Sequence, residues 1–89
     1  MISLRMNAAQ RKTLQAIFEK PTRADIRWAQ IEGLVRAVGG EVTEGRGSRV
    51  RFRIGDRVAT FHGPHPSRIT GKVTVQDVRR FLENAGVQP

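Results

Sequence analysis

The sequence predicts an α+β domain with the element order α-α-β-β-β-α, in which three antiparallel strands carry helices on one face. The chain has 89 residues, enough for one domain with a thin core. Apolar residues recur at helical spacing in three segments, and between the second and third segments the pattern changes to strict alternation. An antiparallel sheet covered on one face leaves its other face open to solvent or to a ligand.

The first helix is predicted over residues 8–20. Asn7 can cap it, with Gln10 three residues later in a capping-box arrangement. Pro21 would end it, because proline lacks the N–H that a helix interior needs. We expect its buried stripe to consist of Leu14, Ile17 and Phe18.

The second helix is predicted over residues 28–38, ending at Gly39, where glycine can adopt the left-handed conformation without steric cost. Its apolar stripe is Ile31, Leu34, Val35 and Val38. Gly33 lies inside this helix at a cost in helix propensity, and a close packing contact would explain its presence.

The third helix is predicted over residues 75–85. Thr74 and Asp77 have the spacing of a capping box, and Gly86 would close the helix. Val87 can then fold back on the helix, whose apolar stripe is Val78, Phe81, Leu82 and Ala85.

The three strands are predicted over residues 41–44, 48–54 and 57–62. The alternation in the second strand sends Arg49, Arg51 and Arg53 to one face and Val50, Phe52 and Ile54 to the other. Together with neighbouring strands, the helix-covered face would bury Val42, Val50, Phe52, Ile54, Ala59 and Phe61.

Two turns set the expected register of the sheet. A two-residue turn at Gly55-Asp56 places Arg49 opposite His62, and a three-residue turn at residues 45–47 places Thr43 beside Arg49. The predicted row across the open face is therefore Thr43, Arg49 and His62, with Arg51 and Arg53 further along. A slip by one residue would drive three arginines into the core, so the buried face is strongly specified.

Charge indicates an anionic partner. Lys and Arg number 16 against 8 acidic residues, a net charge of +8, and thirteen of the sixteen are arginine. The planar guanidinium matches phosphate and stacks on bases, which favours nucleic acid over a merely solubilising coat. The chain has no cysteine, which excludes disulfides, thiolate metal sites and a cysteine nucleophile. With no apolar run of signal-peptide or membrane-spanning length, we expect a cytoplasmic protein with no membrane partner.

Arginines at alternate positions of one strand repel each other, and an anionic ligand would turn that repulsion into affinity. An alternative is an edge charged only for solubility. The long loop over residues 63–73 is either a tie to the last helix or a flap over RNA or a partner contact. The candidate RNA-contacting residues are Arg46, Ser48, Arg49, Arg51, Arg53, Arg68 and Lys72.

Two histidines, His62 and His65, are the candidates for catalysis. Imidazole is the usual general base near neutral pH, although a lone histidine is more often a surface residue. The acidic residues show no spacing typical of a metal or carboxylate site, and the Gly-rich run at 45–48 lacks the ending of a Walker loop. RNA cleavage without a cofactor or metal needs few groups, because the substrate's 2′-hydroxyl is the nucleophile.

Three fragments together resemble a known family: Ile31-Glu32-Gly33-Leu34-Val35 leading to Val38-Gly39-Gly40-Glu41-Val42, then Gly45-Arg46-Gly47-Ser48, and a last helix ending in Asn84-Ala85-Gly86-Val87. The chain is similar to HicA toxins of type II toxin–antitoxin modules over about residues 26–88. The resemblance implies one HicA-like domain over residues 1–89, with residues 1–25 a helical addition to its core. It also implies a fold like the double-stranded-RNA-binding domain, metal-independent cleavage of mRNA that blocks translation, and neutralisation by a HicB-like antitoxin.

One departure from the family pattern bears on catalysis. The family's catalytic histidine follows the Gly-Ser pair, whereas Gly47-Ser48 is followed here by Arg49. Either His62, opposite Arg49 in the predicted register, takes the base role with His65 in support, or the protein binds RNA and cuts it poorly. Three hypotheses therefore remain: an RNA-cleaving toxin, an RNA-binding module or weakened toxin homologue, and a protein-interaction module whose basic face meets an acidic partner.

Overall fold

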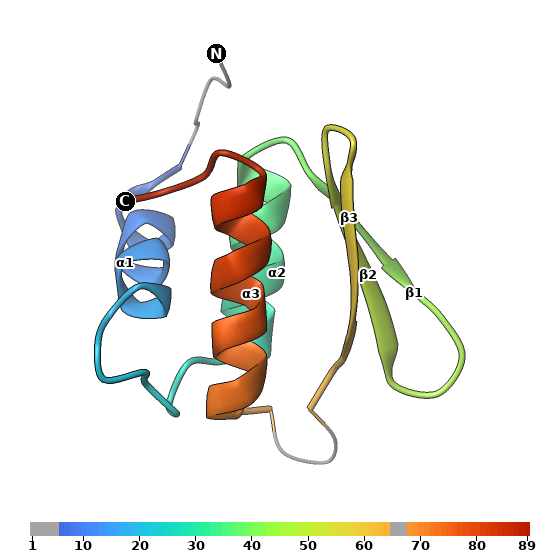
Figure 1. Cartoon of the computed structure of the whole chain (residues 1–89), viewed down its shortest axis with the longest axis horizontal. Coiled ribbons are helices and arrows are strands. Elements are labelled where there is room, and N and C mark those ends of the chain that lie inside the picture. The colour runs from blue at the N-terminus through green and yellow to red at the C-terminus, as the bar shows by residue number, and fades with distance from the viewer. Residues whose placement is uncertain (1–5, 65–67) are drawn as a thin grey trace.

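The computed structural model describes residues 6–64 and 68–89, and the elements follow the order α-α-β-β-β-α. The helices are α1 (Ala8–Ile17), α2 (Trp28–Ala37) and α3 (Lys72–Asn84), and the strands are β1 (Glu41–Glu44), β2 (Arg49–Ile54) and β3 (Arg57–His62). The sheet is antiparallel with the order β1-β2-β3. Figure 1 shows α2 and α3 against one face of this sheet and α1 on their far side. The predicted α+β fold is confirmed, and it is compatible with a double-stranded-RNA-binding-domain-like arrangement.

Helix α1 begins as predicted and ends earlier. The side chain of Asn7 accepts a hydrogen bond from the Gln10 amide, and the Gln10 side chain accepts one from the Asn7 amide, both at 2.9 Å. The helix stops at Ile17 rather than residue 20. The Phe18 amide donates to the Gln15 carbonyl at 3.1 Å and the Glu19 amide to the Ala16 carbonyl at 3.3 Å, so the last turn tightens to bonds between residues three apart and the helix ends before Pro21 is reached.

Helix α3 begins three residues earlier than predicted. Its N-cap is Gly71 and the first helical residue is Lys72, so Thr74 and Asp77 lie inside the helix and do not cap it. The amide of Val75 donates to the Gly71 carbonyl at 2.9 Å, which closes the first turn. At the other end, Gly86 takes a φ of 79° and the Val87 amide donates to the Leu82 carbonyl at 2.8 Å. Val87 is buried, which confirms the predicted fold-back.

The sheet has the predicted register in one hairpin and a shifted register in the other. Gly55-Asp56 closes the β2–β3 hairpin, and Arg49 pairs with His62 as expected. In the β1–β2 hairpin Thr43 pairs with Arg51, not with Arg49. The predicted row of Thr43, Arg49 and His62 is therefore wrong. The shift is two residues, and since side chains alternate with period two, every side chain keeps its predicted face.

The core lies between the sheet and the helix pair and is built around aromatic rings. Phe52 at the centre of β2 is fully buried. The Trp28 ring stacks on it at 5.3 Å between centroids, and the Phe61 ring lies 5.0 Å from it. Val50 and Ile54 are also buried as predicted, whereas Val42 and Ala59 are only partly covered at the margins. Burial of the predicted face fixes which side of the sheet remains open.

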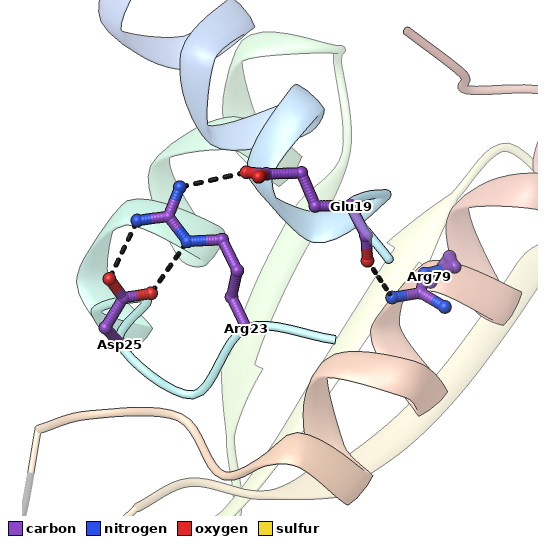
Figure 2. Close-up of polar contacts among 4 residues, drawn as sticks. All are labelled: Glu19, Arg23, Asp25 and Arg79. Carbon is purple, nitrogen blue, oxygen red and sulfur yellow. Dashed lines mark hydrogen bonds and ion pairs between the residues drawn. The ribbon is translucent and has the colours of Figure 1, made fainter. Parts of the chain in front are cut away.

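A polar network joins the end of α1 to α3 (Figure 2). The guanidinium of Arg79 donates to the carbonyls of Ile17 at 2.8 Å and Glu19 at 3.1 Å, where a helix end leaves carbonyls without partners. Arg23 pairs with the carboxylates of Glu19 and Asp25 in the following segment. The hydrogen bond from Arg23 lowers the pKa of the Asp25 carboxyl.

Two glycines next to the sheet have opposite surroundings. A Cβ on Gly40 would lie 2.8 Å from the carbonyl oxygens of Arg53 and Val35, so only glycine fits between α2 and β1. A Cβ on Gly33 would meet nothing within 4 Å. The packing contact expected at Gly33 is therefore absent.

Candidate nucleic-acid interface

The uncovered face of the sheet carries exposed arginines, as the alternation predicts. We call this surface the basic face and define it by Arg49, Arg51, Arg53 and His62, which are all exposed; the three arginines alternate along β2 with the buried residues Val50, Phe52 and Ile54. Three cations at alternate positions of β2 point to the same side of the sheet, which concentrates positive potential on this surface.

The three arginines of the basic face differ in their partners. Arg53 forms an ion pair with Glu41 on β1 and donates to the Gly55 carbonyl at 3.0 Å. The hydrogen bond from Arg53 lowers the pKa of the Glu41 carboxyl from its usual 4.5. Among the residues that the structure describes, Arg49 and Arg51 form no ion pair with a carboxylate, although the charge of Arg51 also contributes to the lowered pKa of Glu41. The cations available to an anionic ligand are therefore Arg49 and Arg51 rather than Arg53.

His62 lies directly across the sheet from Arg49. The two residues pair between β3 and β2, and both side chains are exposed on the basic face. Cross-strand neighbours place their Cβ atoms about 5 Å apart. One ligand group can therefore reach an imidazole and a guanidinium at once.

A shallow groove of about 340 Å³ crosses the basic face. We call it the arginine groove, and its lining includes Thr43, Glu44, Arg46, Arg49, Arg51 and Thr60. Three strands contribute to it at one level, because Thr43 on β1 pairs with Arg51 on β2 and Arg51 pairs with Thr60 on β3. Arg46 reaches it from the β1–β2 loop, where Gly47 turns the chain with a φ of 64°.

A second hollow, of about 300 Å³, adjoins the groove at the start of β2. We call it the acidic hollow, and its lining includes Trp28, Glu32, Glu44, Ser48, Arg49 and Gly63. The Gly63 amide donates to the Ser48 carbonyl at 2.7 Å, which draws the segment after β3 against the β1–β2 loop. Sequence reasoning did not single out Trp28, Glu32, Glu44 or Gly63. The one sequence feature that could have indicated this hollow is Glu32, a charged residue that lies one helical turn after Trp28 and outside the apolar stripe of α2.

The remaining predicted site residues are more dispersed. Arg68 and Lys72 are exposed near the start of α3, and neither lines the arginine groove or the acidic hollow. The loop before α3 is shorter than predicted because the helix begins at Lys72. Its described part is tied down: the Trp28 amide donates to the Arg68 carbonyl at 2.9 Å. His65 lies outside the described residues.

Residues 6–64 and 68–89 contain no group of three or more His, Cys, Asp or Glu side chains that could hold a metal ion. None of the described helices is long and apolar enough to cross a membrane.

The fold and the basic face define a class of small, basic α+β proteins, and comparison with known proteins gives the family. A family model described as the HicA toxin of bacterial toxin–antitoxin matches residues 28–87, more than half of the chain. The chain therefore belongs to the HicA toxin family. The match begins at the first residue of α2, so α1 lies outside it. Neither the curated proteins nor the solved structures give a match.

Proposed function

We propose that this toxin binds mRNA on its basic face and cleaves it without a metal, which blocks translation. The observation that carries the proposal is the pair of His62 and Arg49 on adjacent strands, beside a groove with two arginines free of carboxylate partners among the described residues. Membership of a toxin family supports a damaging activity, and the +8 charge supports a polyanionic target.

The proposed reaction is an internal transesterification. The ribose 2′-oxygen attacks the adjacent phosphorus, the bond from phosphorus to the 5′-oxygen breaks, and the products carry a 2′,3′-cyclic phosphate and a 5′-hydroxyl. His62 takes the proton of the 2′-hydroxyl, and His65, as a protonated imidazole, supplies one to the leaving 5′-oxygen. The guanidinium groups of Arg49 and Arg51 stabilise the charge that develops on the phosphorane oxygens.

The proposed assignments extend to RNA positioning and control. Arg46 and Ser48 at the loop, and Arg68 and Lys72 near α3, contact neighbouring phosphates. Arg53 contributes less, because Glu41 already neutralises it. The antitoxin of the pair is a HicB-like protein that covers the basic face in the cytoplasm, so that RNA and antitoxin compete for the same surface.

Cleavage by purified protein in excess EDTA tests the proposal. We expect a 5′-labelled RNA to give fragments with 2′,3′-cyclic phosphate ends, and a substrate with 2′-deoxyribose at the cleaved position to remain intact. His62→Ala should lower the rate by about 10²- to 10⁴-fold, the usual contribution of a general base. Arg36→Ala, on the exposed side of α2, controls for the change in surface charge. If His62→Ala cleaves at the parental rate, the histidine is not the base.

The second candidate function is RNA binding without efficient cleavage. It is favoured by Arg49 at the position where the resemblance implies the catalytic histidine. It predicts binding of intact RNA by parent and His62→Ala alike, with no cyclic-phosphate products from either protein. An Arg49→His variant then gains cleavage if the lost histidine is the cause.

A further inference from the structure

Two unpaired carboxylates lie beside the arginines that are free to bind phosphate. Within residues 6–64 and 68–89, neither Glu32 nor Glu44 forms an ion pair or a side-chain hydrogen bond. Both line the acidic hollow, and Glu44 also lines the arginine groove. A carboxylate repels phosphate, so its position beside Arg49 opposes backbone binding unless it contacts another part of the ligand.

The acidic hollow and the arginine groove share the lining residues Glu44, Gly45 and Arg49 at the start of β2. Because Arg49 lines both, a strand that places a phosphate on Arg49 brings its neighbouring nucleotide to the mouth of the hollow. Glu32 is half-buried at the wall formed by α2. Gly63 also lines the hollow, where a Cβ would lie 3.4 Å from the indole nitrogen of Trp28.

We propose that the acidic hollow binds an unstacked guanine base of the RNA strand held on the arginine groove. The inference rests on the proposed function and adds a preference for guanine to the proposed RNA binding. A carboxylate accepts two hydrogen bonds and donates none. Guanine is the one standard base whose Watson–Crick edge presents two adjacent donors, N1–H and the N2 amino group. Adenine, cytosine and uracil each place an acceptor beside their donor, which a carboxylate repels.

Glu32 is the principal specificity residue in this assignment, with Glu44 in support. Sequence-specific proteins usually read RNA by hydrogen-bonding unstacked single-stranded bases on this edge. A bidentate pair to a base edge discriminates by roughly 5- to 150-fold in affinity. The arginines position the backbone, and the carboxylate distinguishes the bases.

Binding of short RNAs to the purified full chain tests the assignment. The probes are fluorescent uridine pentamers whose central base is guanine, adenine, cytosine or uracil, with 2′-O-methyl ribose at every position so that no 2′-hydroxyl is left to attack a phosphate. We expect the guanine probe to bind about tenfold more tightly than the other three. Glu32→Gln should abolish this preference and leave the affinity for the all-uracil probe unchanged or slightly higher, because a negative charge beside phosphate is removed.

Glu83→Gln is the matched control, since Glu83 is exposed on α3 and lines neither the acidic hollow nor the arginine groove. Glu44→Gln is a second variant with an exposed parent residue, so folding is expected to survive. Preference for another base, no preference, or a guanine preference kept by both Glu32→Gln and Glu44→Gln would overturn the assignment. No binding of any probe by the parent would instead overturn the proposed function.

Discussion

At the scale of single residues, the arginines differ in the groups that they contact. Arg79 is bound to backbone carbonyls between α1 and α3, and Arg23 to two carboxylates. Arg53 forms an ion pair with Glu41, whereas Arg49 and Arg51 remain available on the basic face to bind an anionic ligand. Net charge alone therefore overstates the number of groups that can bind phosphate.

This difference predicts unequal effects of substitution on RNA binding. Arg51→Ala should weaken binding of single-stranded RNA more than Arg53→Ala, because the latter guanidinium must first leave its carboxylate. The expected reduction for Arg51→Ala is similar across RNA sequences. The slope of log affinity against log salt should also become smaller, by roughly 0.7 for each phosphate that the variant no longer neutralises. Titrations at three salt concentrations measure both quantities. Equal reductions for the two variants would contradict the role given to Glu41.

Part of the candidate site could be predicted from the sequence. Alternation in β2 was enough to place Arg49 and Arg51 outside and Phe52 inside, since one face must be buried. The ion pair of Arg53 with Glu41 was missed because it depends on which β1 residue lies opposite, and the predicted register was shifted. Glu32 was missed because the hollow that it lines is formed by three segments that are separate in the sequence.

At the scale of elements, the hydrophobic pattern of the sequence predicted whether each segment is a helix or a strand. The exact ends of the segments depend on local turn and cap geometry. The first hairpin was misregistered because a shift of two residues preserves the faces, so hydrophobic pattern cannot distinguish the two registers. The start of α3 was misplaced because Thr74 and Asp77 have the spacing of a capping box although they are the third and sixth residues of the helix. The turn at Gly55-Asp56 was correct because a two-residue hairpin fixes the pairing on both sides.

The two glycines near α2 give opposite predictions. Gly33→Ala should raise the free energy of unfolding by up to about 1 kcal/mol, because alanine has better helix propensity and its Cβ meets no atom within 4 Å. Gly40→Ala should lower it by roughly 1–3 kcal/mol, because the Cβ overlaps two carbonyl oxygens. Urea unfolding followed by circular dichroism measures both. A stabilising Gly40→Ala would show that the junction between α2 and β1 can relax.

The packing of α3 against the end of α1 is also testable. Arg79→Met removes three hydrogen bonds made by the guanidinium and leaves the carbonyls of Ile17 and Glu19 without that donor. We expect the free energy of unfolding to fall by about 2 kcal/mol. Arg80→Met, at the next and exposed position, should change it by less than about 0.5 kcal/mol. Similar effects of the two substitutions would argue that Arg79 acts only through charge.

At the scale of the whole molecule, three layers are stacked: α1, the pair α2 and α3, and the sheet (Figure 1). The family match covers the second and third layers. We propose that residues 1–25 are a helical addition to a HicA core, so that the chain forms one domain. Leu14 and Ile17 of α1 are buried, which makes the addition part of the common core.

Acid should destabilise the whole fold through its paired carboxylates. The pKa values of Asp25 and Glu41 are lowered in the folded protein, each mainly by a hydrogen bond from an arginine. The unfolded chain therefore binds protons at a higher pH than the native state. This stabilisation is present above the usual pKa values of 3.8 and 4.5 and is lost as pH falls below them.

The urea midpoint measured from about pH 6 to about pH 3 follows this decrease in stability. Glu41→Gln should show a shallower decline than the parent, because one linked group has been removed. Glu44→Gln, an exposed glutamate on the same strand, serves as its control and should keep the parental pH dependence. A decline that is equally steep in Glu41→Gln would contradict the linkage assigned to the ion pair with Arg53.

The position of α1 has a practical consequence for studying this toxin. Its exposed residue Gln15 lies on the layer remote from the sheet, and the native chain contains no thiol. Gln15→Cys therefore provides a single attachment point for a fluorophore or a sensor chip, with the pair α2 and α3 between the labelled helix and the sheet. The competition proposed between RNA and antitoxin can then be measured on immobilised protein in real time.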